Sequence, residues 1–225
     1  MHPEANLGAG VIVEAGAVIL AGVRIGDGCV LGENSVLGKT PRLGAASTAA
    51  PDGPLPDLLI GKNCKIGCGA VLCAGSKLGD NCLVGDGALV RENVLVGDNA
   101  VIGAHVVVEN KVKIGARTKI QTNAYITALT EIDEDVFIAP CVITTNDNYM
   151  GRTEERFMYK GGPKIRRGAR VGAGAILLPN VTIGAEAFIA AGSIVTKDVR
   201  PGVLFMGAPA KELREVPDKE KLDNP

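Results

Sequence analysis

This sequence contains no tryptophan, and only 3 % of its 225 residues are aromatic. A core without large rings has to be built from Val, Ile, Leu and Ala, which favours narrow and repetitive packing. The chain also lacks an excess of either charge, with 24 basic and 25 acidic side chains. This balance gives no reason to expect a nucleic-acid partner or an anionic membrane surface.

Residues 1–7 contain neither the basic nor the apolar segment of a secretory signal, and no apolar run approaches the roughly 20 residues of a membrane span. The six cysteines form no paired C-x-x-C motifs. We therefore expect a cytoplasmic protein with reduced thiols and without disulfides.

What the sequence has instead is a period of six. Every sixth residue from Ile60 to Ile138 is Ile, Leu or Val, and the fifth position of each hexad is small or β-branched. The same pattern runs from Leu7 to Leu37 and from Ile165 to Val195. An amphipathic helix would repeat every 3.6 residues and an alternating strand every 2, so neither explains the pattern.

We interpret each hexad as a short strand and a tight turn, with three hexads closing a triangular coil of 18 residues. The first-position aliphatic residues should fill the interior, and second-position glycines such as Gly61 should give the turns their backbone freedom. Coils stack about 4.8 Å apart, so residues 18 apart should lie on one another. The sequence predicts an all-β parallel β-helix of about eight coils that spans residues 1–225 as one domain.

Two segments break the phase and should form protruding loops. The first, about 39–58, is rich in Pro, Ala, Gly and Ser and is either a disordered excursion or a functional loop. The second, about 146–164, mixes aromatic and basic residues and is predicted to be functional. Residues 201–225 should form a C-terminal cap, in which Lys211–Val216 either begins a short helix or covers the open end.

Two longer stretches carry a family resemblance. Residues 183–215, IGAEAFIAAGSIVTKDVRPGVLFMGAPAKELRE, resemble the C-terminal signature of hexapeptide-repeat acyltransferases. Within that superfamily, residues 114–147, IGARTKIQTNAYITALTEIDEDVFIAPCVITTND, are similar to bacterial sugar-nucleotide N-acetyltransferases. The resemblance implies a left-handed β-helix, a homotrimer, acetyl-CoA as donor, and a nucleotide-linked amino sugar as acceptor, for surface polysaccharide biosynthesis.

The same resemblance supplies a set of site residues. It places the channel for CoA along the backbone of late coils, around Ala173, Gly174, Ala190, Ala191 and Gly192. The basic residues near the phosphates of CoA would be Lys197, Lys211 and Arg214, although each can equally be a solvated surface charge. Separately from the resemblance, we expect Asn146, Asp147 and Arg152 of the second loop to bind the acceptor sugar.

A zinc site is the first alternative chemistry. The γ-type carbonic anhydrases share this fold and bind zinc with three histidines, whereas this chain has only His2 and His105. Cys64 and Cys82 occupy inward fifth positions and should stack in the core as small apolar groups. We therefore expect no metal.

An O-acetyltransferase is the second alternative. A sugar hydroxyl needs a general base, usually His, and the stretch where related enzymes carry it reads VITTNDN here. A neutral amine needs positioning more than a base, so the missing histidine favours nitrogen as the acceptor atom. A non-catalytic binding protein stays open as a third class, because a fold does not by itself give an activity.

One column follows from the repeat alone. His105, Asn123 and Cys141 occupy fourth positions 18 residues apart and should line one outer edge. The resemblance places Asn123 at the acceptor amine, and His105 lies one coil away as a candidate base. The alternatives are an asparagine ladder for Asn123 and a plain surface turn for His105.

Overall fold

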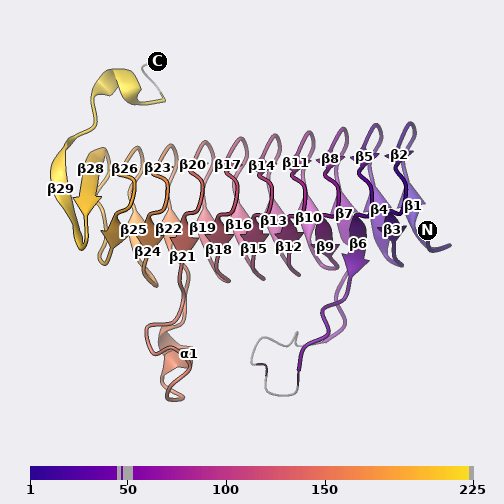
Figure 1. Ribbon diagram of the computed structural model, residues 1–225, viewed down its shortest axis with the longest axis horizontal. Helices are drawn as coiled ribbons and strands as arrows, with labels where there is room; N and C mark the ends of the chain where they lie inside the picture. The colour runs from indigo at the N-terminus through magenta and orange to yellow at the C-terminus, as the bar shows by residue number, and fades with distance from the viewer. Residues whose placement is uncertain (45–46, 48–52, 223–225) are drawn as a thin grey trace.

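The structure, a computed structural model, describes residues 1–44, 47 and 53–222. Within these residues the strands form three sheets that wind around one axis as a left-handed parallel β-helix (Figure 1). Successive strands belong to sheets A, B and C in turn, so each coil adds one strand to each face. The predicted fold class is confirmed.

The strands are short, as a six-residue repeat requires. Sheet A contains β1 (Asn6–Leu7), β4 (Val23–Ile25), β7 (Leu58–Ile60), β10 (Lys77–Leu78), β13 (Leu95–Val96), β16 (Lys113–Ile114), β19 (Glu131–Ile132), β22 (Lys164–Ile165) and β25 (Thr182–Ile183). Sheet B contains β2 (Ile12–Val13), β5 (Val30–Leu31), β8 (Lys65–Ile66), β11 (Leu83–Val84), β14 (Val101–Ile102), β17 (Lys119–Ile120), β20 (Phe137–Ile138), β23 (Arg170–Val171), β26 (Phe188–Ile189), β28 (Val203–Gly207) and β29 (Ala210–Glu215). Sheet C contains β3 (Val18–Ile19), β6 (Val36–Lys39), β9 (Val71–Cys73), β12 (Leu89–Val90), β15 (Val107–Val108), β18 (Tyr125–Ile126), β21 (Ile143–Thr144), β24 (Ile176–Leu177) and β27 (Ile194–Val195).

The coil count differs slightly from the expected eight. In the described chain β1 to β27 place nine strands in each sheet, so these strands make nine coils. The difference arises at β6 and β21, whose hexads are interrupted by the two loops. Each interrupted hexad keeps its strand and loses only its turn, so counting complete hexads misses it.

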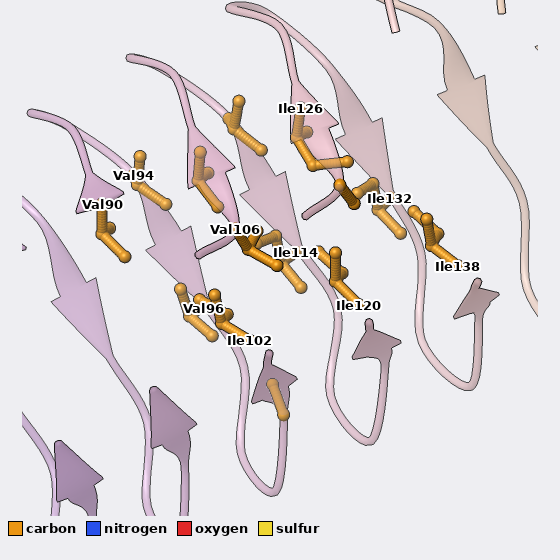
Figure 2. Packing of buried hydrophobic residues seen from close by; sticks show 14 of the residues in the cluster. Val90, Val94, Val96, Ile102, Val106, Ile114, Ile120, Ile126, Ile132 and Ile138 are labelled. Atoms are coloured by element: carbon orange, nitrogen blue, oxygen red, sulfur yellow. The ribbon is translucent and has the colours of Figure 1, made fainter. Parts of the chain in front are cut away.

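The core is a set of aliphatic ladders. Ile102 pairs with Ile120, and Ile120 with Ile138, on adjacent strands of sheet B, and all three are buried. Figure 2 shows these residues stacked coil upon coil. Each fully buried Ile contributes roughly 1.5–3 kcal/mol. Fifth-position residues such as Cys64 and Cys82 are buried beside the ladders, as expected, and their thiols are free.

The expected role of the second-position glycines is wrong. Left-handed backbone occurs instead at the fourth position of the hexads, for example at Asn63 (φ 56°) and Gly69 (φ 65°). The second-position glycines are needed because the next coil lies against them. An added Cβ at Gly115 would lie 2.3 Å from the backbone nitrogen of Glu134.

Both loops leave the solenoid from the C–A corner, the set of turns that follow the strands of sheet C, and Figure 1 shows them on the same side. The second loop contains the short helix α1 (Arg156–Tyr159). The first loop includes residues 45–46 and 48–52, so the choice between a disordered and a functional loop lies outside the described residues.

The C-terminal segment forms a hairpin. β28 extends sheet B in parallel with β26, and β29 pairs antiparallel with β28, so Lys211–Val216 does not begin a helix. The segment then forms a 3₁₀ turn, η1 (Asp218–Glu220), while residues 223–225 of the expected cap lie outside the described residues. Among the described residues, no helix has the length and apolar character needed to cross a membrane.

The outer faces of sheets A and C differ in polarity. Sheet A carries charged residues such as Arg24, Lys77 and Lys113 at its outward positions. Sheet C has a hydrophobic or aromatic residue at the outward position of every strand. These residues, the apolar face of sheet C, are Val18, Val36, Val71, Leu89, Val107, Tyr125, Ile143, Ile176 and Ile194.

Candidate active site

The B–C corner, the set of turns that follow the strands of sheet B, gathers most of the predicted site. It contains both catalytic candidates and the five small residues assigned to CoA: His105, Asn123, Ala173, Gly174, Ala190, Ala191 and Gly192. Hydrogen bonds between adjacent turns show the stacking. The Asn123 N–H donates to the Ala104 carbonyl at 3.1 Å, and the Gly192 N–H donates to the Ala173 carbonyl at 2.9 Å.

His105 and Asn123 both have left-handed backbone, with φ of 55° and 60°. Both side chains are exposed, and neither donates or accepts a hydrogen bond within the described chain. Asn adopts this conformation readily, whereas His does so less often. Because fourth positions along the whole solenoid share it, the conformation alone does not mark a functional residue. The free Asn123 amide remains available for a ligand.

The His105 ring lies against the preceding coil. An added Cβ at Gly87 would lie 2.5 Å from Nδ1 of His105, so glycine at that position makes room for the imidazole. Gly87 precedes His105 by one coil, and Asn123 follows it by one coil. The ring therefore points away from Asn123, and a proton relay between the two needs a bridging water or another rotamer.

The same corner exposes backbone donors, among which Ala173 and Ala191 were expected from the resemblance and Thr122 was not. In an early coil, the Cys68 N–H donates to a carboxylate oxygen of Asp86 at 2.9 Å. In later coils no such acidic residue follows. In the described chain no protein group accepts a hydrogen bond from the N–H of Thr122, Ala173 or Ala191. The signal was readable: the Gly-Asp turn at Asp86 supplies a carboxylate to the preceding coil, whereas the turns one coil after Thr122 and Ala173 read Ala-Pro and Ala-Ala and supply none.

The acceptor-binding candidates lie on the second loop, one prism face away from the B–C corner. Asp147 is engaged inside the loop, because it accepts hydrogen bonds from the N–H groups of Tyr149 (2.8 Å) and Gly151 (3.1 Å) and pairs with Arg156 at 3.1 Å. Burial alone would raise the pKa of Asp147, but these partners together lower it below its ordinary value.

The other two loop candidates, Asn146 and Arg152, differ in whether their side chains already have hydrogen-bond partners. The side-chain Nδ2 of Asn146 donates weakly to the carbonyl of Ala128 at 3.4 Å. The main-chain carbonyl of Asn146 accepts a hydrogen bond from the Gly161 N–H, which joins the two ends of the loop. Arg152 is exposed, and within the described residues its guanidinium has no partner. Of the three candidates, Arg152 is the one free to bind a ligand.

The basic residues assigned to the phosphates lie on two different elements. Lys197 follows β27 at the C–A corner. Lys211 and Arg214 lie on β29, the edge strand of sheet B, where they pair with Met206 and Leu204 of β28. All three are exposed. The described residues contain no group of three His, Cys, Asp or Glu side chains placed to hold a metal ion.

Comparison with known proteins places this geometry in context. Residues 4–39, 57–92, 75–110, 93–128 and 162–197 match the family described as bacterial transferase hexapeptide (six repeats). Serine acetyltransferase of Buchnera aphidicola subsp. Acyrthosiphon pisum is 42 % identical over 71 residues, which are 32 % of this chain and 26 % of that protein. Galactoside O-acetyltransferase of Escherichia coli is 41 % identical over 64 residues, or 28 % of this chain and 32 % of that protein.

An N-acetyltransferase is also similar, namely the 2,3,4,5-tetrahydropyridine-2,6-dicarboxylate N-acetyltransferase of Clostridium perfringens, with 45 % identity over 51 residues, 23 % of this chain and 22 % of that protein. Among solved structures, UDP-N-acetylglucosamine acyltransferase from Campylobacter jejuni superposes with a TM-score of 0.48 and 21 % identity, covering 90 % of this chain and 74 % of that one. The chain thus spans only about a quarter to a third of these curated relatives, whose names include both O- and N-acetyltransferases.

Proposed function

Because this chain belongs to the bacterial transferase hexapeptide family, we propose that it transfers an acetyl group from acetyl-CoA to the amino group of a nucleotide-linked amino sugar, for bacterial surface polysaccharide biosynthesis. The observation that carries the proposal is the B–C corner. There the uncommitted side chain of Asn123 lies in the same row of turns as unpartnered backbone N–H groups. Such a row can hold an acyl donor beside an amine.

The proposal includes a homotrimer. The apolar face of sheet C is too extensive to be left to water in every coil, and packing it around a threefold axis would bury it. In that arrangement the B–C corner of each subunit meets the C–A corner of its neighbour. The second loop of one subunit then approaches Asn123 of the next, which brings together the two halves of the site that lie apart in one chain.

The acetyl donor would lie along the B–C corner, with the N–H groups of Thr122, Ala173 and Ala191 facing it. Backbone donors aimed at a thioester carbonyl stabilise the negative charge that develops on its oxygen during attack. Lys211 and Lys197 would bind the phosphates as flexible positive charges, and Arg214 through its planar guanidinium.

In the proposed mechanism the neutral amine attacks the thioester carbon directly. Asn123 accepts a hydrogen bond from the amine and orients its lone pair, and a neutral amide does this without favouring the ammonium form as a carboxylate would. The C–N bond forms as the C–S bond breaks. The proton lost by nitrogen passes to His105 through water and then to the departing thiolate.

The experiment is a set of three variants assayed with acetyl-CoA and a panel of nucleotide-linked amino sugars. Asn123→Ala should lower kcat/KM by about tenfold to a thousandfold, the range of a lost transition-state hydrogen bond. Cys141→Ala is the matched control from the same column and should be nearly silent, because among the described residues the exposed Cys141 thiol has no hydrogen bond to a base or cation. Full activity in Asn123→Ala would refute the proposed role of the site.

His105→Ala decides the base. A loss of about a hundredfold with a flattened pH profile supports proton transfer by His105, whereas wild-type activity removes it from the mechanism. An O-acetyltransferase is the second candidate, favoured by the similarity to galactoside O-acetyltransferase. Turnover of sugar hydroxyls but not of amines would establish it, and acetyl-CoA binding without any turnover would indicate a binding protein.

A further inference from the structure

The outer face of sheet B carries a pocket of about 590 Å³ beneath the C-terminal tail. Lys119, Phe137 and Arg170, from three consecutive strands, form its floor. Residues 217–222, here called the strap, cover it with the side chains of Glu220 and Leu222. Figure 1 shows the tail on the opposite side of the solenoid from the two loops.

The guanidinium of Arg170 is poorly satisfied beneath the strap. Its Nη1 lies 3.3 Å from Oε2 of Glu220, and its plane sits 4.8 Å above the ring of Phe188. Its Nε and Nη2 are buried and have no hydrogen-bond partner among the described residues. Leaving a charged donor buried and unpaired is unfavourable. The strap therefore pairs with one guanidinium nitrogen and leaves the other two without a partner.

The charge around the pocket leaves room for an anion. Arg117 is committed to Asp135 through two hydrogen bonds of 2.6 and 2.7 Å. Glu186 accepts the N–H of Leu222 at 3.2 Å. Lys119 has no carboxylate within ion-pairing distance in the described chain. Displacing the strap removes the carboxylate of Glu220 from Arg170 and leaves three basic side chains, Arg117, Lys119 and Arg170, facing two acidic ones, Asp135 and Glu186.

The floor also offers an aromatic surface. Phe137 pairs in register with Arg170 and is 40 % exposed. A flat ring beside a guanidinium suits a nucleoside phosphate, because the base can stack while the phosphate takes two parallel N–H bonds. The strap resembles such a ligand in outline, since it puts the carboxylate of Glu220 on Arg170 and the apolar side chain of Leu222 in the same pocket.

We propose that this pocket is a second binding site, that it takes a nucleoside monophosphate with its phosphate on the unpaired donors of Arg170 and its base on Phe137, and that residues 217–222 occupy it when the ligand is absent. Lys119 adds a second positive charge on the far side of the ring. The proposal is independent of acetyl transfer, because the pocket lies against the turns that follow sheet A and not at the B–C corner.

The test is isothermal titration of AMP into the full-length protein. Arg170→Gln should weaken AMP by about tenfold or more, since it removes the bidentate phosphate contact. Glu220→Gln should tighten AMP by about threefold to tenfold, because it removes the competing carboxylate. Asp218→Asn is the matched control from the same strap: Asp218 pairs with Lys221 and not with Arg170, so AMP affinity should not change.

Several outcomes would overturn the proposal. They are no AMP binding to the wild type or to Glu220→Gln, unchanged affinity in Arg170→Gln, or a gain of affinity in Asp218→Asn equal to that in Glu220→Gln. If inorganic phosphate binds as tightly as AMP, the base contributes nothing to the affinity. If adenosine binds as tightly as AMP, the phosphate contributes nothing. The gain expected in Glu220→Gln cannot arise from misfolding, which keeps the test decisive if Arg170→Gln is unstable.

AMP also resembles part of CoA, so the titration is repeated with saturating acetyl-CoA. Unchanged AMP affinity is the expected result, because the acetyl donor would lie along the B–C corner, whereas the pocket lies at the opposite edge of sheet B, against the turns that follow sheet A. Displacement of AMP by acetyl-CoA would place AMP in the donor groove and refute a second site. Failure of AMP to bind would leave acetyl transfer untouched, since that activity is measured separately.

Discussion

Gly115 and Gly69 are both turn glycines, and the structure needs them for different reasons. At Gly115 an added Cβ would lie 2.3 Å from a backbone nitrogen of the next coil, whereas at Gly69 (φ 65°) nothing lies within 4 Å. We predict that Gly115→Ala destabilises the protein by about 1–3 kcal/mol through overpacking. Gly69→Asn should change stability by less than about 1 kcal/mol, because Asn tolerates left-handed backbone. Urea denaturation measures both, and equal losses would contradict the assignment.

Charge reversal at Lys211 or Arg214 tests whether these residues bind the phosphates of CoA. If they bind phosphates of CoA, Lys211→Glu or Arg214→Glu should weaken CoA by about tenfold or more, as expected for lost charge-assisted contacts. Analogues of CoA that lack the contacted phosphate should lose much less. Lys77→Glu on the outer face of sheet A is the matched control. Equal losses for CoA and for the analogues would show that neither residue contacts a phosphate.

The conformation of the second loop depends on the ionised side chain of Asp147. The pKa of Asp147 is lowered in the folded protein, because hydrogen bonds from the loop and from Arg156 outweigh the effect of burial. The stabilisation is therefore present above the unfolded value of about 4 and is lost as pH falls through the folded value. We predict that Asp147→Asn speeds hydrogen exchange of loop amides at neutral pH. Glu154→Gln, exposed in the same loop, should not.

Near-ultraviolet circular dichroism of the loop tyrosines tests the same prediction. Tyr149 and Tyr159 stack in the loop with ring centroids 6.4 Å apart. Their near-ultraviolet dichroism should fade as the pH falls through the lowered pKa of Asp147, below the ordinary carboxyl value of about 4. A signal unchanged at acid pH, together with wild-type exchange in Asp147→Asn, would mean that the loop is held by its other contacts.

How much the sequence could predict depends on the range of the interaction. The hexad pattern predicts the strands β1 to β27 and the burial of the ladders from β3 onward, because every strand repeats the same local rule. It is wrong about burial in the first coil, where Leu7 is half-buried and Val13 is 44 % exposed. It misassigned the second-position glycines, because their constraint comes from a backbone 18 or more residues away. The hairpin of β28 and β29 could not be anticipated, since residues 201–216 carry no six-residue period. Nor could the strap, whose contact between Glu220 and Arg170 joins residues 50 apart.

For the candidate site the same limit applies. The 18-residue spacing predicts that His105, Asn123 and Cys141 share an edge, and the structure places all three at one corner. The second loop interrupts the phase, so spacing could not show that Gly174 and Gly192 lie at the same corner. Spacing gives no side-chain direction, so the turn of the His105 ring toward Gly87 had no sequence signal. The commitment of Asp147 to its own loop was equally hidden, because short-range hydrogen bonds leave no periodic trace.

The apolar face of sheet C is exposed to solvent in the single chain. Ile143 on this face is 43 % exposed in the single chain, about as much as Leu95 (44 %) on sheet A. We predict a homotrimer, observed by multi-angle light scattering as a mass about three times 23.2 kDa. Ile143→Asp should dissociate it by placing a charge in an apolar interface, and Leu95→Asp should not. A wild-type monomer at micromolar concentration would refute the assembly.

A stricter test of the same assembly uses two inactive subunits. If each site combines Asn123 of one subunit with the second loop of its neighbour, Asn123→Ala and Arg152→Ala damage opposite halves. Co-expressed in equal amounts, they should form mixed trimers in which about a quarter of the sites join two intact halves, as random assembly around a threefold axis requires. Activity near a quarter of the wild type is therefore expected. If each site lies within one chain, every site keeps one defect and the mixture stays as inactive as its parents. That result would retain acetyl transfer while removing the shared site.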